Sequence, residues 1–143
     1  MEKEWISKFN IYDGYGIIIA HECGIGIVVL SGRKSACTES RCADLGIDRV
    51  FTGIKNKHDK LIEIAKELKL DLTEIAYIGD DVIDLKAMSL VGFKAAPANA
   101  MSFVKTKVDY ITQNSGGNGA LRELVELVLH CQNRFDECFQ KYL

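Results

Sequence analysis

Short apolar runs rich in β-branched residues recur along the sequence and constrain its fold more than any other feature. Segments of helical periodicity separate these runs. Continuous apolar strands that alternate with helices predict a parallel sheet covered on both faces, so we expect an α/β fold. The predicted strands are "IGIVVL" from Ile25, "RVFTG" from Arg49, "IAYIG" from Ile75, "GFKAA" from Gly92 and "DYIT" from Asp109.

Two segments have the apolar spacing of amphipathic helices that pack on a sheet. The stretch "NKHDKLIEIAKELKL" carries Leu61, Ile64, Ala65 and Leu68 on one stripe, and "GGNGALRELVELVLHC" carries Leu121, Leu124, Val125, Val128 and Leu129. Residues 131–143 keep near-helical spacing, so they either extend the final helix or form a tail. The length of 143 residues and the absence of a linker predict one domain over residues 1–143.

Composition excludes several classes of function. The net charge of −2 and the lack of a basic tract predict no nucleic-acid partner. No stretch is long and apolar enough to span a bilayer, which predicts no membrane partner and a cytoplasmic protein. The five cysteines form no C-x-x-C pair and are odd in number, so we expect neither a zinc site nor a complete disulfide framework, as suits a reducing compartment.

Three aspartates, Asp80, Asp81 and Asp84, lie within five positions directly after the apolar run "IAYIG". Carboxylates packed so closely repel unless a cation or hydrogen-bond donors offset their charge. Mg²⁺ is held by one or two carboxylates together with waters and phosphate oxygens, so one interpretation is a magnesium site. The other is an acidic helix N-terminus, in which Asp80 or Asp81 caps backbone N–H groups.

Polar groups also follow two of the other apolar runs. Ser31, Gly32 and Arg33 come after "IVVL", and Lys57 comes after "FTGIKN". In a parallel sheet the carboxyl ends of the strands meet at one edge, where ligands bind. A hydroxyl, an ammonium and carboxylates gathered there can bind a phosphoryl group and its Mg²⁺. Taken singly, Ser31 is equally consistent with a helix cap and Lys57 with a solvated first-turn residue.

In these motifs the chain resembles the haloacid dehalogenase superfamily, and within it the small capless phosphatases of 3-deoxy-D-manno-octulosonate 8-phosphate. The resemblance covers roughly residues 5–130, from "FNIYDGYGI" through "VVLSGRKS", "LGIDRVFTGIKNK", "IAYIGDDVIDL" and "VGFKAAPANA" to "SGGNGALRE". It implies a three-layer, Rossmann-like parallel sheet, a Mg²⁺ cofactor and a small phosphorylated sugar acid as substrate. It also implies a homotetramer in which the tail of one subunit closes a neighbour's site, and a role in lipopolysaccharide biosynthesis.

The resemblance also assigns roles to residues. It implies that Ser31, Gly32, Arg33 and Lys57 bind phosphate, with Lys57 also stabilising the nucleophile. It implies that Asp80 holds the metal, with Asp81 and Asp84 supporting. The glycine-rich "SGGNGALRE", with Arg122, is then either a phosphate-facing loop or a helix start whose glycines permit close packing.

One part of the family pattern is missing from the sequence. The family begins with a strand that ends in D-x-D-G-x-x-T-D, whose first Asp attacks phosphorus to form an aspartyl-phosphate, and these 143 residues contain no D-x-D. Asp13 is the nearest substitute, although "YDGYGI" is also typical of a helix N-cap. We expect the first strand to lie upstream of Met1, which leaves the domain incomplete at its amino end.

The lost strand lies between "IGIVVL" and "IAYIG" in the family, so its absence predicts unpaired strand edges unless the stretch "EWISKFNI" fills the gap. Two functions follow from these observations. The first is a Mg²⁺-dependent sugar-acid phosphatase, whose activity in this form depends on the missing motif. The alternative is a non-catalytic oligomerisation or regulatory domain, similar to the tail domain of sialic-acid cytidylyltransferases.

Overall fold

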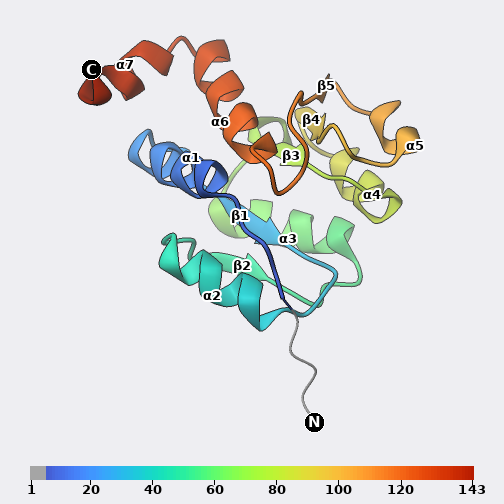
Figure 1. Ribbon diagram of the computed structural model, residues 1–143. Helices are drawn as coiled ribbons and strands as arrows, with labels where there is room; N and C mark the ends of the chain where they lie inside the picture. The colour runs from blue at the N-terminus through green and yellow to red at the C-terminus, as the bar shows by residue number, and fades with distance from the viewer. Residues whose placement is uncertain (1–5) are drawn as a thin grey trace. The chain divides into compact units, whose positions relative to one another are not determined.

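The computed structural model describes residues 6–143 and divides them into two compact units (Figure 1). Unit 1 consists of the described residues up to Gly53 together with Gly117–Leu143, and unit 2 consists of Ile54–Gly116. Each unit contains parallel strands and helices, as the alternation of apolar runs predicts. None of the described helices is both long enough and apolar enough to cross a membrane.

Unit 1 contains a two-stranded parallel sheet, in which Val28 pairs with Arg49 and Leu30 with Phe51. The strands are β1 (Val28–Leu30) and β2 (Arg49–Phe51). The helices are α1 (Ile11–Glu22), α2 (Ala36–Asp44), α6 (Ala120–Cys131) and α7 (Phe135–Phe139), followed by the 3₁₀ turn η3 (Gln140–Tyr142). The last predicted helix therefore ends at Cys131, and the chain turns at Asn133, whose φ is +54°, before a separate short helix.

Helix α1 begins one turn earlier than Asp13, the residue predicted as its N-cap. Asn10 is the N-cap, because its side chain accepts hydrogen bonds from the backbone N–H groups of Tyr12, at 2.9 Å, and Asp13, at 3.2 Å. The Asp13 carboxylate points elsewhere. It accepts hydrogen bonds from the backbone N–H groups of Gly119, at 3.0 Å, and Arg122, at 3.1 Å, and so caps the start of α6.

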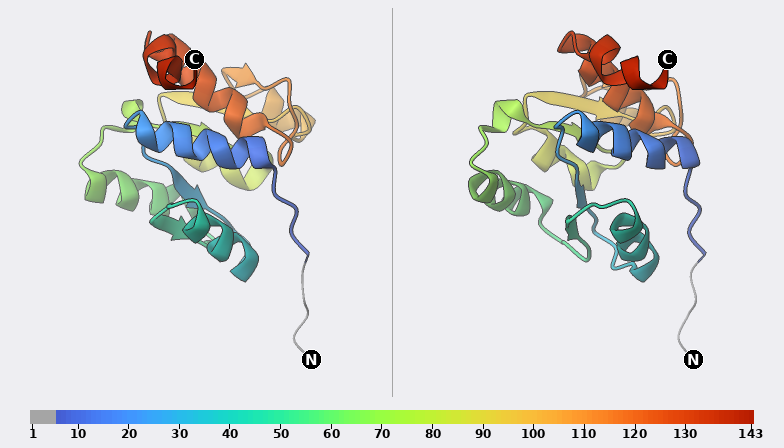
Figure 2. Two further views of the ribbon diagram at one scale, coloured as in Figure 1. Left: turned by 60° about the vertical axis from the view of Figure 1, so that its left-hand side comes forward. Right: turned by 90° about the vertical axis from the view of Figure 1, so that its left-hand side faces the viewer.

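Helices α1 and α6 lie side by side and enclose the main core of unit 1 (Figure 2). Ile19 and Ala20 of α1 are buried against Val125 and Leu129 of α6. The close approach depends on Gly16, since a Cβ there would lie 3.1 Å from the Cα of Arg122. The apolar stripe predicted for the last long helix is therefore correct, and it packs on another helix as well as toward the strands.

A disulfide joins Cys23, at the end of α1, to Cys138 in α7, with 6.0 Å between their Cα atoms. The number and spacing of the cysteines did not predict this bond, and the other three cysteines are thiols. The sequence separation of 115 residues between Cys23 and Cys138 gives no local signal, and only the packing of the α6–α7 segment beside α1 brings them together. Arg134 donates a hydrogen bond to the Cys23 carbonyl, and Lys141 forms an ion pair with Glu22. The carboxyl-terminal segment is thus fixed to α1 at several points.

Unit 2 contains a three-stranded parallel sheet in the order β3-β4-β5. The strands are β3 (Ala76–Ile78), β4 (Phe93–Ala96) and β5 (Tyr110–Ile111). The helices are α3 (Lys57–Leu68), α4 (Leu85–Met88) and α5 (Ser102–Lys105), with the 3₁₀ turns η1 (Leu72–Glu74) and η2 (Val82–Asp84). One core of this unit buries Leu61 of α3 against Ala87 and Val91, and another buries Ala96, Ala100 and Val104.

The five predicted strands are all present, but they form two sheets. In the part of the chain that the structure describes, β1 pairs only with β2, and β3 pairs only with β4. This is the break expected from the absence of a strand between them. Residues 6–10 of the stretch proposed to fill the gap are neither helix nor strand, and Glu4 and Trp5 lie outside the described residues. Each sheet therefore has an edge strand with one unpaired side.

Candidate functional site

The carboxyl end of β3 carries the acidic cluster of the site. The strand ends at Ile78, and the backbone N–H of Gly79 donates a last hydrogen bond to the Ala95 carbonyl of β4, at 3.1 Å. The next two residues, Asp80 and Asp81, turn away from the sheet and lead into η2. The loop is tied to the segment after β4, because the backbone N–H of Met101 donates to the Asp80 carbonyl, at 3.0 Å.

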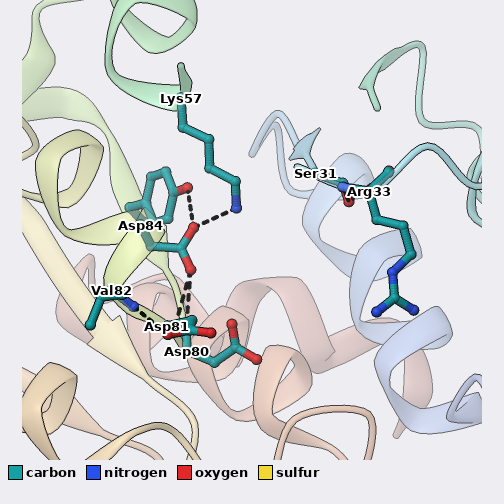
Figure 3. Close-up of polar contacts among 8 residues, drawn as sticks. Ser31, Arg33, Lys57, Asp80, Asp81, Val82 and Asp84 are labelled. Carbon is teal, nitrogen blue, oxygen red and sulfur yellow. Dashed lines mark hydrogen bonds and ion pairs between the residues drawn. The ribbon is translucent and has the colours of Figure 1, made fainter. Parts of the chain in front are cut away.

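Asp84 is the buried centre of this cluster (Figure 3). The residue is 3% exposed, and its carboxylate accepts four hydrogen bonds. Oδ1 accepts from Lys57 Nζ, at 2.6 Å, and from the Tyr77 hydroxyl, at 2.8 Å. Oδ2 accepts from the backbone N–H groups of Asp80, at 3.2 Å, and Asp81, at 3.3 Å. Since a carboxylate offers about four acceptor positions, Asp84 is fully occupied by the protein.

Lys57 begins α3, where Asn56 is the N-cap. Its side chain does not extend into solvent, as a first-turn lysine usually does, but forms an ion pair with Asp84. The two side chains are only 10% and 4% exposed. Two opposite charges with so little exposure to water form a buried ion pair. The interpretation of Lys57 as a solvated residue is therefore wrong.

Tyr77 was missed by the sequence analysis, although it contacts the centre of the cluster. It lies in the middle of β3, and its hydroxyl donates to Asp84. Burial raises the pKa of Tyr77, and the negative charges of Asp84 and Asp80 raise it further, so the hydroxyl keeps its proton. A signal was available. Tyr77 is the one aromatic residue in "IAYIG", and a buried tyrosine hydroxyl usually has a polar partner.

The three aspartates of the cluster differ in what they bind. Asp81 is the N-cap of η2, and its carboxylate accepts from the backbone N–H of Val82, at 2.7 Å, as the acidic-cap interpretation predicts. Asp84 is the buried acceptor described above. The Asp80 carboxylate is exposed and accepts no hydrogen bond from any described residue. Among residues 6–143 no group of three or more His, Cys, Asp or Glu side chains is placed to hold a metal ion.

Asp80 is thus the aspartate of the three with both carboxylate oxygens available to a hard cation. Mg²⁺ is usually bound by one or two protein carboxylates and takes its other ligands from water and substrate phosphate. A single available carboxylate beside a filled one fits that pattern of binding, with Asp81 and Asp84 holding the loop in place through their own contacts.

Ser31, Gly32 and Arg33 form a separate polar group in unit 1, directly after β1. The backbone N–H of Ser31 donates to the Phe51 carbonyl, at 2.8 Å, which continues the pairing with β2. Its hydroxyl donates to the Arg33 carbonyl, at 3.1 Å, and accepts from the Arg33 N–H, at 3.2 Å. Ser31 therefore closes a tight turn around Gly32. It is not a helix cap, because the N-cap of α2 is Ser35.

The glycine-rich stretch "SGGNGALRE" is the start of α6, which favours the second of its two interpretations. Gly119 has a φ of +105°, a conformation suited to glycine, and its N–H donates to Asp13. The Arg122 guanidinium forms an ion pair with Glu126 and lies over the Phe139 ring, with its Cζ 5.8 Å from the ring centroid. Arg122 is thus used in the packing of unit 1.

Comparison with known proteins shows which of them share this sequence and fold. Residues 47–124 match the model of the haloacid dehalogenase-like hydrolases. The chain is 38% identical, over 134 residues, to the 3-deoxy-D-manno-octulosonate 8-phosphate phosphatase of Escherichia coli (strain K12), and the match covers 94% of this chain and 71% of that protein.

Two solved structures show the same likeness in three dimensions. The first is the corresponding phosphatase of Moraxella catarrhalis in complex with a magnesium ion, a phosphate ion and a KDO molecule. It has a TM-score of 0.93 and 37% identity, covering 96% of this chain and 79% of that one. The second is the cobalt-bound enzyme of Haemophilus influenzae, with a TM-score of 0.89 and 37% identity, covering 93% and 78%. The sequence match, the α/β fold and the resemblance inferred from the motifs agree, and the chain belongs to the haloacid dehalogenase-like hydrolase family.

Proposed function

We propose that this chain is the phosphate-binding and metal-binding part of a Mg²⁺-dependent phosphatase that acts on a sugar-acid phosphate such as 3-deoxy-D-manno-octulosonate 8-phosphate. The observation that carries the proposal is the buried Lys57–Asp84 pair beside the available Asp80 carboxylate at the end of β3. The chain is also 37–38% identical to phosphatases of that substrate, which supports the same class of reaction. The relatives described above give no support to a non-catalytic role.

Asp80 is the residue that would hold Mg²⁺ in this proposal. The ion supplies positive charge that offsets the developing charge on phosphoryl oxygens. Asp84 fixes the backbone on either side of the Asp80–Asp81 peptide, so the Asp80 side chain starts from a defined position. Asp81 holds the following turn by capping Val82. The two supporting aspartates thus hold the loop in place, and Asp80 is the one of the three that would bind the metal.

Lys57 would bind and orient the phosphoryl group. Its ammonium is held at 2.6 Å from Asp84, with little exposure, and an ammonium in a poorly hydrated site interacts strongly with anionic oxygens. We assign phosphate binding also to Ser31, Gly32 and Arg33. The turn that Ser31 closes exposes Gly32 and Arg33 at the end of β1, where a parallel sheet offers ligands its polar edge.

The covalent step needs a group that these residues do not provide. In the proposed reaction a carboxylate attacks phosphorus, the bond from phosphorus to the sugar oxygen breaks, and an acid protonates that oxygen as it leaves. Water then hydrolyses the aspartyl-phosphate and releases inorganic phosphate. The 143 residues contain no D-x-D motif, and Asp13 is occupied in capping α6. The proposal therefore assigns the nucleophile to a strand ending in D-x-D-G-x-x-T-D that these residues do not include.

Adding such a strand tests the proposal directly. The 143-residue chain is compared with the same chain extended at its amino end by a strand that ends in D-x-D-G-x-x-T-D. We expect Mg²⁺-dependent release of phosphate from 3-deoxy-D-manno-octulosonate 8-phosphate by the extended chain only. A matched extension with the first Asp of the motif changed to Asn controls for stabilisation by the strand. The Asp80→Asn and Lys57→Met variants of the extended chain should each be inactive.

Two results would count against the proposal. Turnover by the 143-residue chain that Asp13→Asn abolishes would show that Asp13 is the nucleophile. Tight, stoichiometric Mg²⁺ binding to that chain in a calorimetric titration would show that Asp80 is not the sole protein carboxylate available, since fewer charged ligands predict weak binding. By the same family likeness we propose a homotetramer, which sedimentation of the extended chain would test.

A further inference from the structure

The Tyr77 hydroxyl and the Lys57 ammonium both donate hydrogen bonds to the charged carboxylate of Asp84. Both groups donate to the same oxygen, Oδ1, at 2.8 Å and 2.6 Å, while Oδ2 accepts only backbone N–H groups (Figure 3). One face of the carboxylate thus carries the proposed phosphate ligand, and the other carries the loop of the proposed metal ligand. A change in the orientation of this one carboxylate moves both.

Strand β3 also holds the Asp84 side chain in place. Successive side chains of a strand point to opposite faces, so Tyr77 and Gly79 share a face. A Cβ at Gly79 would lie 2.7 Å from the Asp84 Cβ, which means that the Asp84 side chain packs directly on the strand there. Without the Tyr77 hydroxyl, the packing would keep Asp84 near the strand, but the flexible Lys57 side chain would be the one remaining side-chain donor to Oδ1 and would alone set the rotation of the carboxylate on that side.

The hydroxyl also controls how strongly Lys57 is held. A hydrogen bond to a charged acceptor is stronger than one to a neutral acceptor. The bond from Tyr77 therefore offsets part of the negative charge that attracts Lys57. If Lys57 were the only side-chain donor to Oδ1, its ammonium would be held more tightly and would be less available to a phosphoryl oxygen. Burial raises the pKa of Tyr77, so the phenol remains a donor at neutral pH.

We propose that Tyr77 is a positioning residue of this site, which sets both the Lys57 ammonium and, through Asp84, the Asp80 loop for binding phosphate. The inference rests on the proposed function for its purpose, but its structural content stands on the contacts of Asp84 alone. It assigns a role to a residue outside the polar motifs, in the strand that leads into the acidic cluster.

The test compares Tyr77→Phe with Thr106→Val in the full chain. The second variant also removes a hydroxyl from unit 2, one that donates to the Phe103 carbonyl at 2.7 Å, far from Asp84 in sequence. The first readout is amide hydrogen exchange by NMR. We expect Tyr77→Phe to speed exchange at Asp80 and Asp81 about tenfold, the effect of one lost hydrogen bond to a charged group, with β4 and β5 unchanged. The second readout is the ¹⁵Nζ signal of Lys57, which should shift in Tyr77→Phe only.

The third readout separates this inference from the proposed function. Inorganic phosphate is titrated in the presence of Mg²⁺, and Tyr77→Phe should bind it several-fold more weakly than Thr106→Val. If the unmodified chain binds no phosphate while the two NMR effects appear, the proposed function is wrong for this chain and the positioning of Lys57 and Asp80 by Tyr77 stands. If exchange rises equally throughout unit 2, or if the Lys57 signal does not move, Tyr77 is a packing residue and the inference is overturned.

Discussion

Replacing Asp84 by Asn should destabilise the protein more than replacing any charged residue on the surface, because the Asp84 carboxylate is buried among hydrogen-bond donors. Asp84 and Lys57 are 4% and 10% exposed and lie 2.6 Å apart. Asn has the same shape, but it has one oxygen and one NH₂ group where Asp84 has two acceptors. Its oxygen can serve the Lys57 and Tyr77 donors or the backbone N–H groups of the Asp80 loop, but not both. The NH₂ group then faces donors, and the Lys57 ammonium loses its countercharge.

The size of the effect follows from this loss. Removing one partner of a buried ion pair costs about 3 to 5 kcal/mol, since it leaves a buried charge without compensation. A domain of ordinary stability has only about 5 to 15 kcal/mol in total. We therefore expect Asp84→Asn to lower the free energy of unfolding in urea by about 3 to 5 kcal/mol, a large fraction of the total stability of such a domain.

A matched control uses the Lys60–Glu63 pair of the same unit. Its atoms are 2.7 Å apart, but the Glu63 side chain is 55% exposed. Glu63→Gln should therefore cost about 1 kcal/mol or less. Adding Lys57→Met to Asp84→Asn removes the uncompensated charge, so the double variant should be less destabilised than the sum of the single ones. If Asp84→Asn cost no more than Glu63→Gln, the buried pair would not be the centre of this cluster.

Four further predictions concern other parts of the molecule. Reducing the Cys23–Cys138 disulfide with dithiothreitol should lower the melting temperature, with about 5 kcal/mol as the upper limit from a loop of 115 residues, and Cys138→Ser should abolish the response to reductant. Asp13→Ala should lower the free energy of urea unfolding by about 1 to 2 kcal/mol, because α6 loses its cap; an unchanged value would show that the cap is not needed. Tyr77 has an ordinary pKa of 10 that folding raises, so the stability it contributes is present below that pH and is lost above it; thermal melts between about pH 9 and 11 should show a smaller loss for Tyr77→Phe. The open edges of β1 and β3 should make the chain self-associate on size-exclusion chromatography, and an added strand should suppress this.

The sequence was sufficient to find the strands, because their signal is local. Each predicted run contains a strand in the structure, and every one of these strands is shorter than its run. Ile25–Leu30 was predicted, for example, and β1 covers Val28–Leu30. Apolar composition marks the residues that are buried, whereas the length of a strand depends on the neighbour that pairs with it, and β1 has one such neighbour.

The errors have a common cause in contacts between distant segments. Asn10 and Asp13 are both good caps, and only the position of α6 decides that Asp13 serves a different helix. The Cys23–Cys138 pair likewise depends on the packing of the α6–α7 segment beside α1. At the site, the sequence placed three aspartates close together and the resemblance gave the metal to Asp80. The spacing could not show that Asp84 is buried against Lys57, since that depends on a residue 27 positions away.

The division of unit 1 into two stretches of chain has a consequence for synthesis on the ribosome. Unit 2 is one continuous segment, so all of β3, β4 and β5 are translated and leave the ribosome before α6. Domains fold as units as the chain emerges, and contacts between distant segments form slowly. We expect unit 2 to fold first. Until α6 is available to pack against α1, Ile19 and Ala20 of α1 remain exposed to solvent. Helix α1 precedes unit 2 in the chain but is buried after it, and during that interval its apolar face is exposed to chaperones.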